Sequence, residues 1–302
     1  MRQCFVRKNK LRPFPGGVAP KLLYVSKIES EDSIYPRTLH AHDNCAEIIL
    51  ICSGSGYYSI DGKRYLVQEG DLVFLNSGVL HDEMSDSNTL VASYCCAIGD
   101  LAMEGLPVNV LVPADAFPVV PCGDRFETIR KLFELLFELL LTAKTGADET
   151  CHFLMMSLLT QVQILLEFPV SCEVAQSEYR EEGLGVLGFR IKGYIDEHYH
   201  EDIGLQSIAE ELNISPYYLA HVFKEGSGYS PVNYILRRRI GEAQTLLINT
   251  DDNVTQISSL VGYDNPSHFN FIFTKHVGMS PLKYRKSYTV KSETNSKAKS
   301  NT

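Results

Sequence analysis

Four residues in the first third of the chain are of the types that bind transition metals. His40 and His42 are two positions apart, Glu47 follows shortly after them, and His81 lies farther along. Because residues two apart in a β-strand point to the same side, His40 and His42 could bind one metal ion. With Glu47 and His81 they would supply three imidazoles and one carboxylate. That set suits zinc, iron, manganese or nickel rather than calcium.

The segments around these residues resemble the two sequence motifs of the cupin barrel, a small double-stranded β-helix: His40-Ala-His42-x4-Glu47-x6-Gly54 and Gly70-x5-Asn76-x-Gly78-x2-His81. Three positions depart from the motifs, because Ile34 replaces a Gly and because Asn76 and Ser85 replace a Pro and an Asn. Many related sensor domains keep similar histidines as barrel framework without a metal. Two interpretations therefore stay open, a divalent transition metal site and a histidine framework that needs no cofactor.

Short predicted strands must position these side chains. Between residues 21 and 98 the chain reads KLLYVSKI, AEIILICS, GYYSI, KRYLVQ, DLVFL and LVASYCCAI, separated by turn residues. Asp61-Gly62 predicts a tight hairpin, because both residues tolerate positive φ. Many short strands at close spacing predict a sandwich or small barrel, whose mouth could hold a small ligand. We expect this pocket to be lined by His40, His42, Glu47, Tyr57 and His81.

Two amphipathic helices are predicted after the barrel, over residues 125–141 and 149–167. Phe and Leu recur at helical spacing in both segments. Helices this apolar must bury a face. They either pack on their own barrel or form a self-association interface that also packs locally, and the second alternative predicts a homodimer.

The sequence Gly-x-Ser-Pro-x-x-Tyr occurs twice in the last third of the chain, at 228–234 and at 278–284. Upstream of it, Ser215-Pro216 aligns with Asn265-Pro266 at the same offset. In each copy a capping residue and a Pro begin a helix, and the Gly ends it. The buried face of these helices is predicted to consist of Leu219, Phe223, Phe269 and Phe273.

A shorter helix is predicted before each of these, over 205–212 and 254–261. Helix, short turn and helix is the helix-turn-helix arrangement, whose second helix can lie in the DNA major groove. A continuous helix over 231–247, about 25 Å long, would join the two units. Such a spacer could place both second helices in successive major grooves on one face of the duplex.

The segment from about Gly188 to Lys286 resembles the DNA-binding domain of AraC/XylS-type transcriptional regulators. The resemblance is carried by Leu219…Phe223-Lys224…Gly228, Arg239-Ile240…Ala243…Leu246-Leu247, Ile257…Val261-Gly262-Tyr263 and Phe269…Phe273…Gly278-x-Ser280-Pro281…Tyr284-Arg285. It implies an asymmetric DNA site that is read by two recognition helices.

Candidate DNA contacts follow from position in these helices. Base-reading residues are expected to be Tyr217, Tyr218, Ala220 and His221 in the first helix, and Pro266, Ser267, His268, Asn270 and Phe271 in the second. Phosphate contacts are expected from Lys224, Arg237, Arg238, Lys275, Lys283, Arg285 and Lys286, whereas Arg239 is expected in a structural ion pair. Family members often carry Arg at the position of Phe271 and Lys at that of Thr274. The second unit is therefore expected either to bind DNA weakly or to read it mainly by shape and thymine methyl groups.

Composition excludes several classes of protein. The net charge of −9 argues against a general nucleic-acid binder, and its acidic excess lies before residue 185, whereas cations cluster at 237–239 and 283–286. The eight cysteines form no C-x-x-C pair, which is typical of reduced thiols, although Cys95-Cys96 could be a redox or metal-sensing pair. Neither a signal-peptide core nor a membrane-spanning run is found, so a cytoplasmic protein without a membrane partner is expected.

The predicted fold class is α+β multidomain. A cupin-like ligand-sensing barrel is expected at 1–122, a helical dimerisation segment at 123–168 and a linker at 169–187. The all-α double helix-turn-helix domain is expected at 188–289 and a disordered tail at 290–302.

These features together predict a transcriptional regulator rather than an enzyme. Its partners would be double-stranded DNA, a small-molecule effector such as a sugar, a second copy of the chain and RNA polymerase. One alternative is a metal-dependent cupin enzyme, such as a dioxygenase or isomerase, with an accessory helical domain. Another is an architectural DNA binder without a ligand, which the acidic first half fits poorly.

Overall fold

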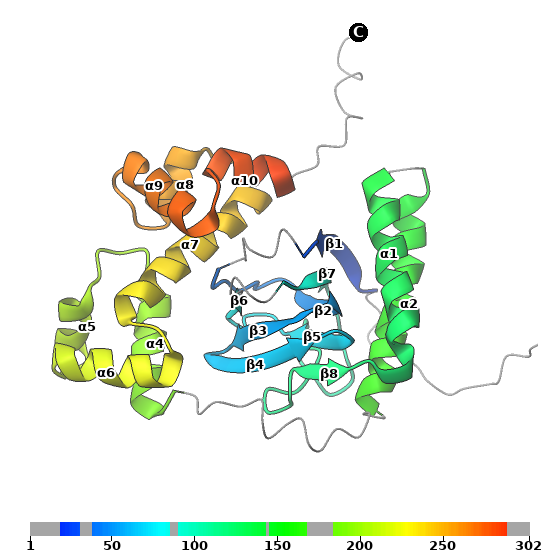
Figure 1. The fold of residues 1–302 in the computed structure, drawn as a ribbon, viewed down its shortest axis with the longest axis horizontal. Coiled ribbons are helices and arrows are strands. Elements are labelled where there is room, and N and C mark those ends of the chain that lie inside the picture. The colour runs from blue at the N-terminus through cyan, green and yellow to red at the C-terminus, as the bar shows by residue number, and fades with distance from the viewer. Residues whose placement is uncertain (1–18, 31–37, 85–89, 143–144, 168–183, 289–302) are drawn as a thin grey trace, which may run out of the picture.

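The computed structural model describes residues 19–30, 38–84, 90–142, 145–167 and 184–288. Ile34, Ser85, the tail at 290–302 and most of the predicted linker at 169–187 lie outside these residues. The β-barrel occupies the centre of the molecule, with α1 and α2 on one side and the helices from α4 to α10 on the other (Figure 1).

Two antiparallel sheets form the barrel. One has the strand order β1-β7-β2-β5-β8 and the other the order β4-β3-β6. The strands are β1 (Lys21–Ile28), β2 (Ala46–Ser53), β3 (Ser55–Ile60), β4 (Lys63–Gln68), β5 (Asp71–Leu75), β6 (His81–Met84), β7 (Ala92–Gly99) and β8 (Val119–Pro121). The predicted strands are confirmed, whereas the short β6 and β8 were not predicted because neither has the length or the alternation of a typical strand.

The turn between β3 and β4 has the predicted conformation. Asp61 has φ 49° and Gly62 has φ 77°, the pair of positive angles that a tight type I′ hairpin requires. The register runs from Ser55 opposite Gln68 to Ile60 opposite Lys63 without a shift. Hairpin geometry therefore fixes which side chains of β3 face inward.

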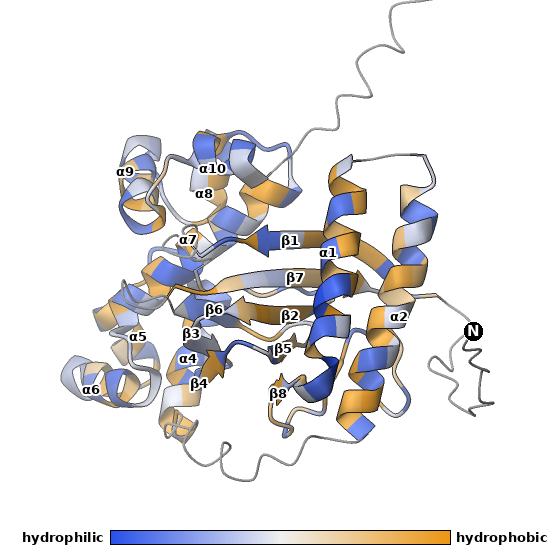
Figure 2. Ribbon diagram, turned by 45° about the vertical axis from the view of Figure 1, so that its right-hand side comes forward, coloured by the Kyte–Doolittle hydropathy of each residue, from blue (hydrophilic) through white to orange (hydrophobic). Residues whose placement is uncertain are grey.

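Helices α1 (Phe126–Thr142) and α2 (Ala147–Glu167) pack on the five-stranded sheet (Figure 2). Their inward faces share one apolar cluster with the strands, to which Ile129, Phe133 and Met155 contribute fully buried side chains. Local packing is therefore confirmed for these faces. Large apolar side chains remain exposed on the other faces, namely Leu135, Leu141 and Phe153. Among the described helices, none has the length and apolar character needed to cross a membrane.

Between residues 184 and 288 the regular elements are all α-helices. These helices are α4 (Val186–His198), α5 (Leu205–Glu211), α6 (Pro216–Ser227), α7 (Pro231–Asn249), α8 (Val254–Leu260), α9 (Pro266–Val277) and α10 (Pro281–Tyr288). A 3-10 turn, Gly123–Arg125, precedes α1. Leu219 and Phe223 lie in the core of the first unit, and Phe269 and Phe273 in that of the second; all four are fully buried, as predicted. Barrel residues Leu39 and Leu80 complete the core of the first unit.

The repeated Gly-x-Ser-Pro-x-x-Tyr motif is a helix stop followed by a helix start. Gly228 and Gly278 end α6 and α9 with φ of 76° and 79°. The Ser230 hydroxyl accepts a hydrogen bond from the Asn233 amide at the start of α7. Tyr234 and Tyr284 are buried in the cores beneath. The motif is therefore scaffold rather than a binding site.

Six cysteines in the described part of the chain are thiols rather than disulfides. Cys95 and Cys96 are adjacent in β7, so their side chains point to opposite faces of the sheet. Cys96 is fully buried in the core, and burial raises the pKa of its thiol. This arrangement does not favour the redox-pair alternative.

We predict opposite effects of alanine at two helical glycines. Gly278→Ala places a Cβ in the left-handed region and should lower the free energy of unfolding by about 1–2 kcal/mol. Gly193→Ala, inside α4, meets no atom within 4 Å and should raise that free energy by about 0.5–1 kcal/mol. Urea unfolding measures both, and a change of the same sign in both variants would contradict the assigned helix stop.

Candidate nucleic-acid interface and ligand cavity

The outward face of α6 carries the first set of predicted base-reading residues. Tyr217 is 82% exposed and Tyr218 is 52% exposed, while His221 is also exposed and Ala220 is half-buried. The Ser215 hydroxyl accepts a hydrogen bond from the Tyr218 amide and so begins the helix. Helix α6 lies at the outer edge of the molecule, away from the barrel (Figure 1).

Helix α9 presents the second set in the same way. Phe271 is 65% exposed, Ser267, His268 and Asn270 are exposed, and Pro266 is half-buried. The side chain of Asn265 accepts hydrogen bonds from the backbone amides of Ser267 and His268 and begins the helix. Each unit thus presents aromatic and polar side chains on a helix whose other face is fixed by buried core residues.

The lysines predicted to contact phosphate are all at the surface, namely Lys224, Lys275, Lys283 and Lys286. The three predicted arginines are not, and this prediction requires correction. Arg285 donates hydrogen bonds to the carbonyl oxygens of Leu247, Thr250 and Asp252, at 2.8, 3.2 and 2.7 Å. It therefore holds α10 to the end of α7, where helix carbonyls lack partners.

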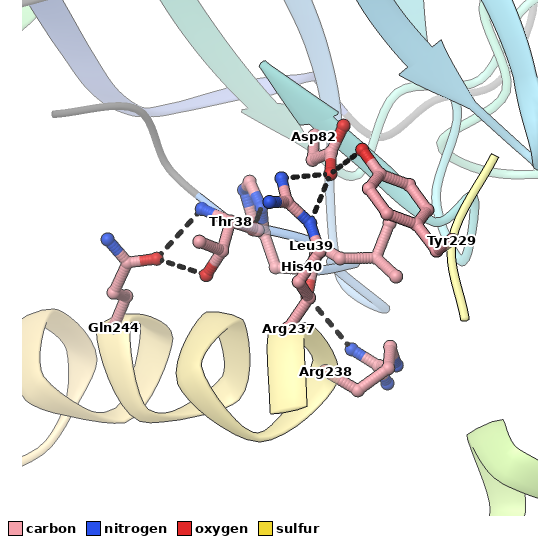
Figure 3. Close-up of polar contacts among 8 residues, drawn as sticks. All are labelled: Thr38, Leu39, His40, Asp82, Tyr229, Arg237, Arg238 and Gln244. Carbon is pink, nitrogen blue, oxygen red and sulfur yellow. Dashed lines mark hydrogen bonds and ion pairs between the residues drawn. The ribbon is translucent and has the colours of Figure 1, made fainter. Parts of the chain in front are cut away.

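Arg237 and Arg238 face the barrel instead of solvent (Figure 3). Arg237 donates to one Asp82 oxygen from Nε at 3.1 Å and from Nη2 at 2.6 Å. Arg238 donates to Asp196 at 3.0 Å and to the Leu39 carbonyl at 3.3 Å. Both guanidinium groups are thus occupied by contacts within the protein, and in this arrangement neither is presented to DNA.

Arg239 is structural, as predicted, but its partners differ. It donates hydrogen bonds to the carbonyl oxygens of Tyr199 and Glu201, both at 2.6 Å, rather than to a carboxylate. These contacts hold α7 to the end of α4. The sequence could not distinguish a carbonyl partner from a carboxylate partner, because backbone groups leave no signal in residue types.

The four candidate metal ligands are brought together inside the barrel. His40, His42, Glu47 and His81 are buried, and one ligand atom from each lies within 4.8 Å of the others. His42 Nε2 lies 3.5 Å from Glu47 Oε1, and His81 Nε2 lies 3.3 Å from Glu47 Oε2. Tyr24, which the sequence analysis did not select, donates its hydroxyl to Glu47.

Backbone carbonyls fix the orientation of two of these rings. His40 Nδ1 lies 2.7 Å from the Thr38 oxygen, and His81 Nδ1 lies 2.9 Å from the Val79 oxygen. Since a carbonyl only accepts, both Nδ1 atoms carry the proton. The Nε2 atom of His81 then faces the Glu47 carboxylate at 3.3 Å. Either a second proton or a divalent transition metal fits this donor set.

The cluster forms the floor of a cavity of about 270 Å³. Its walls are lined by Leu23, Tyr24, Val25, Ser26, Ile28, Ile49, Glu83 and Cys95 of the barrel and by Ile248 and Asn249 of α7. Tyr57 is not among the lining residues, so its predicted place in the pocket is wrong. It lies on the outer face of β3, 40% exposed, with the Arg64 guanidinium 4.6 Å from its ring centre.

Helix α7 is held against the barrel by a second set of contacts that the sequence did not reveal. The Gln244 side-chain oxygen accepts hydrogen bonds from the Thr38 amide at 2.9 Å and from the Thr38 hydroxyl at 2.7 Å (Figure 3). A Cβ at Gly241 would lie 2.0 Å from the Leu39 carbonyl oxygen, so only glycine fits there. We call these contacts, together with the Arg237–Asp82 and Arg238–Leu39 contacts, the α7–barrel contact.

The Asp82 carboxylate of the α7–barrel contact needs partners because it is buried. Its side chain is fully buried, and an isolated buried carboxylate would be strongly unfavourable. Besides Arg237, it accepts a hydrogen bond from the Tyr229 hydroxyl at 3.5 Å. Burial and the neighbouring Asp82 raise the pKa of Tyr229 to about 12, so this hydroxyl stays protonated and donates.

Two family models match the chain. Residues 23–162 match the AraC-like ligand binding domain, and residues 208–287 match a helix-turn-helix domain. The first covers the barrel together with α1 and most of α2, and the second covers both helix-turn-helix units from within α5 to α10.

Individual relatives agree with these models. The chain is 30% identical over 287 residues, 95% of its length and 92% of the relative's, to the uncharacterized HTH-type transcriptional regulator YdiP of Escherichia coli (strain K12). It is 26% identical over 244 residues, 80% of its length and 84% of the relative's, to the lactose operon transcription activator of Staphylococcus xylosus. Among solved structures, the C-terminal domain of AraT, a response regulator from Geobacillus stearothermophilus, matches 39% of this chain and 98% of its own, with 32% identity and a TM-score of 0.36.

We predict that Glu47→Gln destabilises the barrel. The amide removes the charge that holds the imidazoles, and losing charge-assisted hydrogen bonds costs about 1.5–3 kcal/mol. Glu104→Gln, at an exposed position, is the matched control and should change the free energy of unfolding by less than about 0.5 kcal/mol. Urea unfolding of both variants makes the comparison, and equal stability of Glu47→Gln and the wild type would contradict the role of the carboxylate.

Elemental analysis of the same wild-type sample distinguishes a metal site from a shared proton at Glu47. About one equivalent of a transition metal assigns the cluster to metal binding, and less than about a tenth assigns it to a shared proton.

Proposed function

This chain belongs to the AraC-type transcriptional regulators, and we propose that it reads DNA with α6 and α9 in response to a small metabolite bound in the barrel. The proposal rests on the combination of two helix-turn-helix units with a barrel that lines a cavity of about 270 Å³ with both apolar and polar side chains. The two matching family models describe a helix-turn-helix domain and an AraC-like ligand binding domain, and the relative from Escherichia coli is named a transcriptional regulator. Neither comparison supports the alternative of a cupin enzyme.

We assign base reading to the outward residues of the two recognition helices. These are Tyr217, Tyr218, Ala220 and His221 in α6 and Pro266, Ser267, His268, Asn270 and Phe271 in α9. Helix α7 has 19 residues and is about 28 Å long, which is close to the 34 Å between successive major grooves. Phosphate positioning then falls to the exposed lysines, Lys224, Lys275, Lys283 and Lys286.

The proposed effector is a neutral sugar or a similar polyhydroxylated metabolite. Imidazole, carboxylate and hydroxyl groups of His40, His42, Glu47, His81 and Tyr24 line one side of the cavity and can both donate to and accept from hydroxyl groups. The resemblance to a lactose operon transcription activator agrees with a role in sugar use.

Further partners belong to the same proposal. A homodimer would use the exposed apolar residues Leu135, Leu141 and Phe153 on α1 and α2. Contact with RNA polymerase would follow if the protein activates transcription. Binding to chromosomal DNA would place the protein in the cytoplasm.

A mobility-shift assay across the region upstream of its own gene tests the DNA-binding proposal. We expect sequence-specific retardation at about 100 mM salt. Tyr217→Ala combined with His221→Ala should weaken specific binding at least tenfold while leaving binding to random DNA nearly unchanged, because base contacts carry sequence information. Equal losses on both DNAs would contradict the base-reading role of α6.

Phosphate contact makes a separate prediction for Lys283. Lys283→Ala should weaken binding to specific DNA and to random DNA to a similar extent. It should also reduce the slope of log K against log salt concentration by about one. Gln256→Ala, also in the second unit but uncharged, should leave the salt slope unchanged. An unaltered slope for Lys283→Ala would remove this lysine from the DNA interface.

A further inference from the structure

Two residues of the DNA-binding domain line the effector cavity. Ile248 and Asn249 are the last residues of α7, and they face the cavity together with the barrel residues. We propose that the effector site is shared by the two domains, so that the effector contacts the end of α7 directly. The proposal deepens the function given above and rests on it, because it takes the effector to be a metabolite bound in this cavity.

The two sides of the cavity have complementary chemistry. The floor holds the imidazole and carboxylate groups around Glu47, whereas Asn249 offers a carboxamide that donates and accepts and Ile248 offers apolar surface. About 270 Å³ is just below the range of about 300–1,000 Å³ for pockets that hold drug-sized ligands. A ligand the size of a monosaccharide, with hydroxyl groups at both ends, fits this volume and polarity.

The α7 side of the site is firmly connected to the second helix-turn-helix unit. Ile248 packs against the apolar core of that unit as well as lining the cavity. Arg285 of α10 holds the carbonyl oxygens of Leu247 and Thr250 on either side of the two lining residues. Helix α8 begins at Val254, directly after this segment. A ligand that shifts Ile248 or Asn249 therefore shifts the second unit with them.

The floor of the cavity is equally close to the α7–barrel contact. His40 follows Thr38 and Leu39, which contact Gln244, Gly241 and Arg238. His81 precedes Asp82, which holds Arg237, and the backbones of His40 and His81 are joined by two hydrogen bonds of 2.9 Å. The same two backbone segments thus carry ligand-binding groups on one side and contacts to α7 on the other.

Occupancy of the cavity and docking of α7 must then be linked. A ligand that contacts both domains binds the docked arrangement more tightly than an undocked one, and by reciprocity it stabilises docking by the same factor. Allosteric couplings of this kind change affinity by about 5–150-fold. The effector would act by fixing the position of α7, and hence of both recognition helices, relative to the barrel.

The direct test uses full-length protein and a panel of D-galactose, D-xylose, L-arabinose and L-rhamnose. The sugar that raises the Tm of the wild type most is titrated by calorimetry into the wild type, Asn249→Ala and Asn233→Ala. Asn233 is an exposed residue of the same type near the start of α7 and is the matched control. We expect about tenfold weaker binding to Asn249→Ala, as for one lost hydrogen bond, and no change for Asn233→Ala. Wild-type affinity in Asn249→Ala would overturn the shared site.

A second measurement does not depend on knowing the ligand. Cys95 lines the cavity, whereas Cys52 packs beside the apolar cluster under α1 and α2. Gly241→Ala forces a Cβ against the Leu39 carbonyl and should lift α7 from the barrel; Gln244→Leu removes the acceptor for Thr38 with little change in size. Alkylation by N-ethylmaleimide, followed by peptide mass analysis, should then become at least tenfold faster at Cys95 and stay unchanged at Cys52.

Each outcome decides something different. If no sugar in the panel raises the Tm, the proposed effector class is wrong, and the thiol measurement alone decides whether α7 closes the cavity. Equal alkylation of Cys95 in the wild type and both variants would overturn the inference. Faster alkylation of Cys95 without sugar binding would support the shared site and reject only the sugar.

Discussion

The close approach of α7 to the barrel at Gly241 determines how the helical domain is placed against the barrel. With the Leu39 carbonyl only 2.0 Å from where a Cβ would lie, the helix can dock only through a residue that has no side chain. This contact brings Gln244 to Thr38, Arg238 to the Leu39 carbonyl and Arg237 to Asp82. It also sets the end of α7 against the cavity. The helix that spaces the two recognition helices is therefore also a wall of the sensor domain.

The buried Asp82 carboxylate restricts how α7 can dock on the barrel. Asp82 has no exposed side-chain surface, and Arg237 and the protonated Tyr229 hydroxyl are its partners from the helical domain. Separating the domains would expose the Asp82 and Arg237 charges to water, where both are solvated at little cost in free energy. Docking in a shifted register would bury Asp82 without Arg237, and an unpaired buried charge is strongly unfavourable in free energy. The ion pair thus selects one docked geometry. The apolar contact of Leu39 and Leu80 with the core of the first unit supplies the area that stabilises it.

Local patterns made much of the fold and part of the site predictable. The offset of 50 between the two motifs identified both helix stops, and helical spacing identified Phe223 and Phe273 as core. The residue types and spacing of His40, His42, Glu47 and His81 predicted the buried cluster, although His40 and His42 lie before β2 rather than within a strand, and His40 is placed by an isolated bridge to His81. The partners of arginines were not predictable in this way. Charge suggested phosphate for Arg237, Arg238 and Arg285, but the choice between DNA, a carboxylate and a backbone carbonyl depends on which elements pack together. The pocket position predicted for Tyr57 was wrong because successive side chains of β3 point to opposite faces, and Tyr58 rather than Tyr57 is buried.

In the proposed function, α6 and α9 are held at a fixed spacing and read two successive major grooves. Hydroxyl-radical footprinting with the full-length protein on a retarded DNA fragment measures this most directly. We expect two protected patches on one face of the duplex, with centres about 10–10.5 base pairs apart, because α7 sets the spacing of α6 and α9. A single patch, or two patches on opposite faces, would contradict it.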